Sequence, residues 1–227
     1  MGSASGKLLQ AEGAKLALLY APFEAANFKP AIKSNYGYDS EEQAGDKIKG
    51  YECDITQPDS VKKAFDAIAK DNVAFPSILI NTAGYVNLTP LEDFPPEDAL
   101  KHYMINLYGP TLTSQAFARM YIERSKQETA PGGRIVTLAS QAAHVALKNH
   151  GPYCASKAGL IGLNKCMASE WGPYGITANT ISPGPVWTEM GKKAWADKDA
   201  RDAYLLNVPS GGFAEPEEVA RIVRRTP

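Results

Sequence analysis

Two side chains that could transfer a proton stand one helical turn apart in the segment Tyr153-Cys154-Ala155-Ser156-Lys157. Residues four apart lie on the same face of a helix, so the Tyr153 phenol and the Lys157 ammonium would be neighbours. A phenol with a pKa near ~10 transfers protons poorly at neutral pH, and a nearby cation favours its phenolate form. The pair therefore predicts proton transfer to or from a carbonyl oxygen. The alternative is a solvated surface pair, although only Tyr153 among the 11 tyrosines has a lysine four residues later.

The elements that must position this pair alternate between buried strands and helices. Short apolar runs predict strands at 16–20, 49–53, 77–80, 134–138 and 177–181, and helical spacing predicts helices near 61–68, 96–125, 152–170 and from 215 onward. This alternation is typical of βαβ units with right-handed crossovers and a mostly parallel sheet. We expect an α/β fold with a doubly wound parallel sheet, forming a single domain over residues 1–227.

Ligands of such sheets bind beyond the carboxyl ends of the strands. The residues that directly follow the predicted strands, or end them, are Tyr20, Asp54, Asn81, Ser140 and Ser182. Ser140 ends a strand shortly before the helix that carries Tyr153. The strand ends therefore predict a polar site that combines Ser140 with Tyr153 and Lys157.

Ser140, followed thirteen residues later by Tyr153 and then by Lys157, resembles the active-site signature of the short-chain dehydrogenase/reductase family of the classical type. Three further segments occur in the family's order. Asn81-Thr82-Ala83-Gly84 is similar to its N-N-A-G element, Asn106 resembles its active-site asparagine, and Ser182 to Thr188 resembles the loop that meets the nicotinamide. The resemblance covers roughly residues 13–220. It implies a Rossmann-like fold and an NAD(P)(H)-dependent oxidoreductase that interconverts a small-molecule alcohol and a carbonyl by hydride transfer.

The resemblance also implies a role for each matching residue. Tyr153 would be the general acid in reduction and the general base in oxidation, and Lys157 would tune it and bind the nicotinamide ribose. Ser140 would hydrogen-bond the substrate carbonyl, and Asn106 would hold a water that supplies protons. Cofactor contacts are expected from Asp54, Ile55, Asn81, Ala83, Gly84, Tyr153, Lys157, Pro183, Gly184, Val186 and Thr188. For Asp54 and Asn81, a structural role in a turn or cap is the alternative.

The choice of cofactor has its own marker. Sites that select NAD carry Asp or Glu after the second strand, where the carboxylate binds the ribose 2′-hydroxyl. That position is Tyr20 here, followed by Ala21-Pro22. Because no acid stands there to repel a 2′-phosphate, we expect NADP(H) rather than NAD(H). Lys29 and Lys33 are the nearest basic side chains.

The pattern departs from the family at both ends. The family's first strand is absent, and of its T-G-x-x-x-G-x-G turn only Gly2 and Gly6 match, with Leu8 in place of the third glycine. We interpret residues 2–6 as a flexible terminus. The last helical pattern stops near Arg225 without a further strand. We therefore expect a chain truncated at both ends, with the first and last strands missing and an incomplete pyrophosphate site.

Composition excludes several other classes of protein. With 24 basic and 25 acidic side chains the net charge is −1, so no electrostatic footprint for nucleic acid exists. No apolar run approaches the ~18 residues of a membrane span, and the beginning of the chain has no signal-peptide features. The three cysteines lack metal-ligand spacing, which indicates no metal site and a reducing, cytoplasmic setting.

Substrate and assembly are less strongly marked. Residues 184–213 predict a mobile, apolar-rich substrate lid, with an oligomer contact or core packing as the alternatives. His144, Lys148 and Asn149 would suit a polar substrate such as a polyol or sugar. By resemblance we expect a homo-oligomer, a dimer or tetramer, with the helices around Asn106 and Tyr153 at its interface.

Two other functions are alternatives to the oxidoreductase. One is a catalytically silent remnant of the family that serves as a scaffold or partner-binding subunit. The other is a hydrolase, which is disfavoured because Ser140 lacks a G-x-S-x-G elbow.

Overall fold

The structure is a computed structural model and describes residues 1–71, 75–126 and 132–226. Its strands are β1 (Leu16–Tyr20), β2 (Ile48–Glu52), β3 (Ile78–Asn81), β4 (Gly133–Leu138) and β5 (Ile176–Ile181). Its α-helices are α1 (Gly2–Ala11), α2 (Ala25–Tyr36), α3 (Glu41–Ala44), α4 (Pro58–Lys70), α5 (Pro96–Tyr103), α6 (Gly109–Ser125), α7 (Gly151–Trp171), α8 (Glu189–Ala194), α9 (Lys198–Leu205) and α10 (Pro216–Arg225). The predicted strands and helices are all present, and each strand boundary lies within one residue of its prediction.

All strand pairs within the described residues are parallel, but they form two separate sheets. One has the order β1-β2 and the other the order β3-β4-β5. In the part of the chain that the structure describes, β1 and β3 do not pair with each other, as expected for a fold without the family's first strand. A cavity of about 810 Å³ lies between their facing edges and is lined by residues 16–20 and 77–83.

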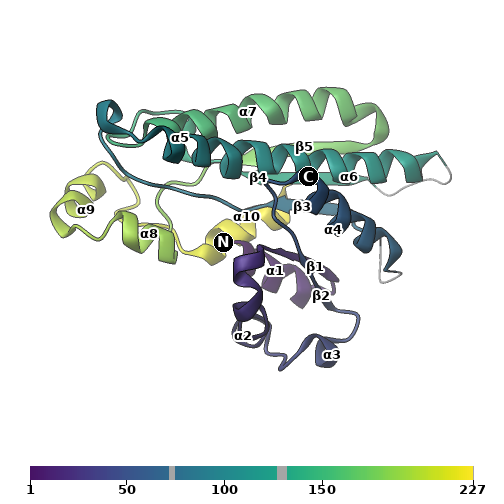
Figure 1. The fold of residues 1–227 in the computed structure, drawn as a ribbon. Helices are drawn as coiled ribbons and strands as arrows, with labels where there is room; N and C mark the ends of the chain where they lie inside the picture. Colours follow the sequence, from purple (N-terminus) through teal and green to yellow (C-terminus); the bar gives the residue numbers. More distant parts are fainter. Residues whose placement is uncertain (72–74, 127–131, 227) are drawn as a thin grey trace.

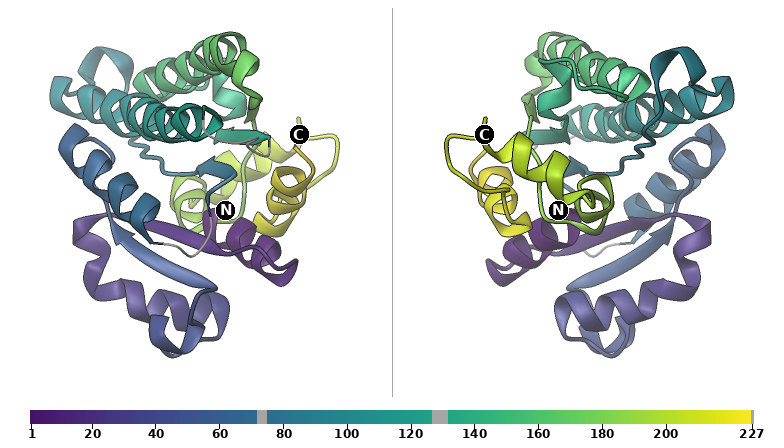
Figure 2. Two further views of the ribbon diagram at one scale, coloured as in Figure 1. Left: turned by 90° about the vertical axis from the view of Figure 1, so that its right-hand side faces the viewer. Right: turned by 90° about the vertical axis from the view of Figure 1, so that its left-hand side faces the viewer.

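Helices cover both faces of the sheets, which confirms the doubly wound α/β fold (Figures 1 and 2). On one face α4, α6 and α7 bury the larger apolar core, which centres on Phe65, Phe117, Tyr121, Ile135 and Ile176. On the other face α10 contributes Val219 and Val223, which pack with Val136, Leu138 and Met1. The strands β4 and β5 are therefore covered on both sides, as their continuous apolar sequences predict.

The structure corrects the interpretation of residues 2–6 as a flexible terminus. They belong to the ten-residue helix α1, which packs against α10. An ion pair between Glu12 and Arg224 joins the ends of the two helices. Contacts with α2 and chiefly with the distant α10 hold α1 in place, which is why its own sequence did not predict it.

The long segment 184–213 is also more ordered than expected. It contains α8 and α9, and both begin at a side chain that accepts a hydrogen bond from the backbone of the first turn. Thr188 accepts from the N–H of Gly191 at 3.1 Å, and Asp197 accepts from the N–H of Ala200 at 2.8 Å. Such caps satisfy backbone donors that a helix start otherwise leaves unpaired. None of the helices in the described ranges has the length and apolar character that crossing a membrane requires.

Candidate active site

The site forms where β4 ends and α7 begins. Ser140 follows β4 and caps a short 3-10 helix, its hydroxyl accepting a hydrogen bond from the N–H of Ala142 at 3.2 Å. Tyr153 lies in the first turn of α7, close enough to Ser140 for that hydroxyl to lower the pKa of its phenol. The predicted combination of these two side chains is therefore present.

Lys157 lies one turn further along α7 and is only 4% exposed. Its Nζ donates a hydrogen bond to the main-chain oxygen of Leu138 at 2.8 Å and lies 5.8 Å from the centroid of the Tyr153 ring. Burial lowers the pKa of Lys157 from 10.5 to about 8, because a charged group loses hydration in the interior. The interpretation of this pair as a solvated surface feature is thereby excluded.

The pKa of Tyr153 departs from the sequence-based expectation. Burial raises it above its ordinary value of 10.0, the hydrogen bond from Ser140 acts in the opposite direction, and Cys154 adds a smaller upward effect. The expected lowering by Lys157 is not present, since that ammonium faces the Leu138 carbonyl beside the ring. In this state Tyr153 is a neutral phenol at pH 7, the form that can donate a proton.

Asn106 is fully buried in a π-helical turn, Met104–Tyr108, between α5 and α6. Its Nδ2 donates to the Tyr85 carbonyl at 2.9 Å and to Ser156 Oγ at 3.0 Å, and its Oδ1 accepts from the Tyr85 N–H at 2.7 Å. Both amide hydrogens are therefore used within the protein. π-Helical turns inside α-helices are frequent at functional sites because they disturb the regular pairing of main-chain carbonyls.

Two predicted cofactor residues use their side chains to hold the fold. Asn81, which lines the 810 Å³ cavity, binds α6 by donating to Ser114 Oγ at 3.0 Å and accepting from Thr113 Oγ1 at 2.8 Å. Asp54 accepts from the N–H of Thr56 at 2.9 Å and from its hydroxyl at 2.7 Å. Both bonds are those expected of a turn aspartate, which is the structural alternative for Asp54.

The remaining predicted cofactor residues are divided between two places. Ile55 and Ala83 line the 810 Å³ cavity, on the β1–β2 side and at the end of β3. In the loop after β5, the Pro183 carbonyl accepts from the N–H of Gln141 at 2.8 Å, which ties this loop to Ser140. Val186 is 6% exposed and packs in the core, while Thr188 caps α8.

Three glycines lie close to other parts of the chain at the strand ends. A Cβ on Gly84 would lie 3.8 Å from both Asn106 Oδ1 and Lys157 Nζ, and one on Gly184 would lie 3.5 Å from Gln141 Oε1. A Cβ on Gly2 would lie only 2.6 Å from Thr82 Oγ1, so α1 begins in close contact with the chain after β3. Gly2, Ser3 and Gly6 of α1 line the 810 Å³ cavity, and a helix N-terminus attracts phosphate. The expectation of an incomplete pyrophosphate site stays a prediction.

Acidic groups surround the position that was expected to select NADP(H). Tyr20 ends β1 opposite Glu52 and stacks on Phe28 with 4.2 Å between ring centroids. Burial raises the pKa of Tyr20, and the charges of Glu52 and Glu41 raise it further. Lys33, one of the two basic candidates, forms an ion pair with Asp39 at 2.8 Å.

Sequence reasoning missed Gln141, which follows Ser140 directly. Its Nε2 donates to Tyr204 Oη at 2.6 Å, and that hydroxyl lies 2.8 Å from Oε1. Tyr204 belongs to α9 and packs on Trp195 with ring centroids 4.4 Å apart. The side chain next to Ser140 therefore contacts the segment expected to cover the substrate, a link that no local spacing signals.

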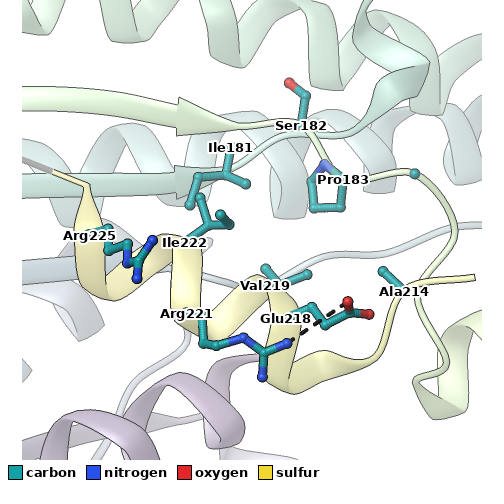
Figure 3. A pocket seen from close by; sticks show the side chains of 10 residues that line it. Ile181, Ser182, Pro183, Ala214, Glu218, Val219, Arg221, Ile222 and Arg225 are labelled. Atoms are coloured by element: carbon teal, nitrogen blue, oxygen red, sulfur yellow. Dashed lines mark ion pairs between the residues drawn. The ribbon is translucent and has the colours of Figure 1, made fainter. Parts of the chain in front are cut away.

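A second cavity, of about 430 Å³, opens between the end of β5 and α10 (Figure 3). Its walls comprise Ile181, Ser182, Pro183, Gly184, Ala214, Glu218, Val219, Arg221, Ile222 and Arg225. Arg221 and Glu218 form an ion pair of 3.9 Å there. Ser140, Tyr153 and Lys157 do not line this cavity, so it adjoins the site only through the loop after β5.

Comparisons with known proteins agree with this geometry. A family profile described as enoyl-(acyl carrier protein) reductase matches residues 1–224. The chain is 39% identical over 220 residues to the D-threitol dehydrogenase of Mycolicibacterium smegmatis, covering 97% of this chain and 78% of that protein. It is 33% identical over 216 residues to the NADH-dependent L-xylulose reductase of Ambrosiozyma monospora, covering 93% and 78%. A crystal structure of gluconate 5-dehydrogenase from Burkholderia cenocepacia in complex with NADP and tartrate is similar with a TM-score of 0.82, 27% identity and 98% and 81% coverage.

The chain belongs to the short-chain dehydrogenase/reductase family. It is an oxidoreductase that interconverts an alcohol and a carbonyl by hydride transfer and uses a nicotinamide cofactor. The oxidoreductase is thereby favoured over the silent scaffold.

Proposed function

We propose that the protein interconverts small polyols and the corresponding polyhydroxy ketones, with Ser140, Tyr153, Lys157 and Asn106 as its catalytic residues. The observation that carries the proposal is the convergence of Ser140, Tyr153 and the buried Lys157 where β4 meets α7. The relatives described as threitol dehydrogenase and xylulose reductase support the substrate class.

A nicotinamide held at this site would supply hydride chemistry at the substrate carbon. In reduction, the Tyr153 phenol would donate its proton to the substrate oxygen, and the Ser140 hydroxyl would hydrogen-bond the same oxygen as negative charge develops on it. Lys157 would hold the cofactor ribose, and its ammonium would stabilise the phenolate once the proton has left. Because both amide hydrogens of Asn106 are already used, its part in proton supply runs through Oδ1 or its main-chain carbonyl.

Polar groups near Ser140 support a hydroxylated substrate. Gln141 carries an amide beside the catalytic serine, and His144 Nε2 lies 3.0 Å from Ser182 Oγ. The Gln141–Tyr204 bonds connect this polar surface to α9, which supports the interpretation of residues 184–213 as a substrate lid. The prediction that Lys148 and Asn149 bind a polar substrate has less support. The Asn149 carbonyl accepts a hydrogen bond from the N–H of Thr89 at 3.2 Å.

The preference for NADP(H) remains a prediction, and the structure offers an argument against it. Glu52 and Glu41 act on Tyr20 where a 2′-phosphate would have to bind, and Lys33 is paired with Asp39. Relatives of both kinds exist, one described as NADH-dependent and one crystallised with NADP. The ratio of kcat/KM for NADPH and NADH decides between them.

Three broader predictions accompany the proposal. A single domain over residues 1–227 is supported by the cores that link both sheets to the helices. A homo-oligomer through the helices around Asn106 and Tyr153 is supported by exposed apolar side chains on α5, of which Leu100 is 59% exposed. A cytoplasmic, reducing setting is supported by the three free cysteines.

The test follows the consumption of NADPH or NADH with L-xylulose, D-ribulose and dihydroxyacetone, and with cyclohexanone as a ketone that lacks hydroxyl groups. We expect turnover of the hydroxylated ketones and a loss of roughly 10²–10⁴-fold in the variant Tyr153→Phe. Wild-type turnover in Tyr153→Phe would refute the assignment of the general acid. No turnover and no thermal stabilisation by either nucleotide would favour the scaffold function instead.

A further inference from the structure

A buried histidine lies beneath Tyr153, outside the predicted site. His102 lies in the last turn of α5, is fully buried, and has both ring nitrogens hydrogen-bonded. The N–H of Asn87 points at its Nε2 at 3.1 Å, and its Nδ1 lies 2.7 Å from the main-chain oxygen of Asp98. Because an N–H can only donate and a carbonyl can only accept, Nε2 is the acceptor and Nδ1 carries the hydrogen. The two partners therefore fix His102 as one neutral tautomer.

His102 and Asn106 both bind the loop that follows β3. The loop after β3 is bound at Tyr85 by two hydrogen bonds with the Asn106 amide, of 2.7 and 2.9 Å. Two residues later it is bound at Asn87 by His102. Asp98 adds two connections by accepting from the Tyr85 hydroxyl at 3.0 Å and from the side-chain amide of Asn87. If the bond to His102 is lost, the loop keeps its attachments to Asn106 and Asp98, but the main chain at Asn87 loses its hydrogen-bond acceptor.

The imidazole also contacts the catalytic tyrosine. Its ring lies edge-on to the ring of Tyr153, with centroids 6.4 Å apart and an interplanar angle of 78°. On its other sides it meets Tyr85 at 4.8 Å and Phe94 at 5.5 Å in the same edge-on manner. Edge-to-face arrangements of this kind fix the relative orientation of rings. His102 thus lies between the loop that binds Asn106 and the phenol that would transfer the proton.

We propose that His102 is a positioning residue of the reaction. By accepting from the Asn87 N–H, it fixes the loop that binds Asn106 and so sets the placement of Asn106 relative to Tyr153, while it touches neither substrate nor cofactor. This inference rests on the proposed function of Tyr153. Misplacing a catalytic group by about 1 Å can cost on the order of 10²-fold in rate, so a fault here should affect kcat more than KM.

Two variants separate the hydrogen bond from the ring. His102→Phe keeps an aromatic ring but has no acceptor for Asn87, whereas His102→Gln can bring an amide oxygen near the position of Nε2. Phe94→Leu is the matched control, because it disturbs the same ring cluster without touching either hydrogen bond of His102. For each variant, kcat, KM, the unfolding temperature and the hydrogen exchange of the Asn87 amide are measured.

We expect His102→Phe to lower kcat by roughly 10-fold to 10²-fold with KM changed by less than about threefold, and to speed exchange at Asn87. His102→Gln should recover most of kcat and most of the protection. Phe94→Leu should lower the unfolding temperature and leave kcat within about twofold. Such a pattern distinguishes positioning from a general loss of stability.

Two results would overturn the proposal. The first is a wild-type kcat in His102→Phe while the Asn87 amide exchanges faster. The second is a loss of kcat in His102→Gln as large as that in His102→Phe, while the Asn87 amide stays protected. If His102→Phe does not fold, the comparison of His102→Gln with Phe94→Leu decides by the same criterion. If the wild-type protein has no activity, the proposed function fails independently of His102. The role of His102 is excluded separately if the exchange rate at Asn87 is unchanged in both His102→Gln and His102→Phe.

Discussion

Lys157→Met tests the electrostatic basis of the site without requiring a substrate. Methionine is an unbranched apolar side chain that can fill the space of the lysine stem. In the wild-type protein the pKa of Lys157 falls from 10.5 in the unfolded chain to about 8 in the folded one because of burial. Between these two values the unfolded chain binds more protons, so the contribution of Lys157 to the unfolding free energy rises with pH.

The magnitude follows from the size of the pKa shift. Each pKa unit corresponds to about 1.4 kcal/mol, and integration over the titration gives a rise of roughly 2 kcal/mol between about pH 8 and about pH 10. Below about pH 7.5 the cost of burying the charge is constant, so the curve is flat there. The lost hydrogen bond to Leu138 shifts the whole curve but has little influence on its slope, since a neutral amine also donates.

The assay is urea unfolding of the nucleotide-free protein at a series of pH values, with the free energy of Lys157→Met subtracted from that of the wild type. The difference should be flat at low pH and should then rise by roughly 2 kcal/mol toward about pH 10. Lys165→Met, which removes an exposed lysine from the same helix, is the control and should give a flat difference. A flat curve for Lys157→Met as well would refute the reasoning that Lys157 is held desolvated beside Tyr153.

Three further predictions concern the parts around this centre. Gly2→Ala places a Cβ 2.6 Å from Thr82 Oγ1, so nucleotide affinity measured by calorimetry should fall roughly tenfold, and adding Thr82→Ala should restore much of it. Tyr204→Phe removes the bonds to Gln141, worth about 1 kcal/mol each, so the KM of the ketone should rise roughly fivefold and proteolysis within residues 184–213 should accelerate. Asn81→Leu removes the amide that donates to the buried Ser114 hydroxyl, while the Thr113 hydroxyl keeps its main-chain acceptors, so the unfolding free energy from urea titration should fall by about 1–3 kcal/mol.

Each of these predictions has an outcome that contradicts it. For Gly2, a double variant no better than the single one would show that the contact with Thr82 is not the cause. For Tyr204, an unchanged proteolysis rate would mean that Gln141 does not hold α9. For Asn81, a stability loss below about 0.5 kcal/mol would mean that its bonds to α6 contribute little.

How far the sequence predicts this fold depends on whether an element is held locally. The strands were found to within one residue, because each is a short apolar run between polar or turn-forming residues. Helix α1 was misread as a flexible terminus, since the contacts that hold it come from α2 and mostly from α10, at the other end of the chain. Helices α8 and α9 begin at Thr188 and Asp197, whose capping role sequence spacing alone leaves ambiguous.

The same division applies to the site. The spacing of Tyr153 and Lys157 on one helix placed them together, and the strand before them supplied Ser140. The pKa direction of Tyr153 was wrong, because burial depends on everything that packs around α7 rather than on the four-residue spacing. His102 was missed because its partners, Asn87 and the carbonyl of Asp98, carry no motif.

The separation of the β1–β2 ladder from the β3–β4–β5 ladder has a consequence for how the molecule unfolds. In the described chain no strand pairing joins the two, so the smaller sheet can open while the backbone bonds of the larger one stay intact. Contacts such as α1 on α10 then decide whether the two parts melt together. A dinucleotide with its adenine end on the β1–β2 part and its nicotinamide end beside Tyr153 would bridge them. Its binding would add to the apolar core, shared by Tyr51 and Ile135, that already couples the two parts.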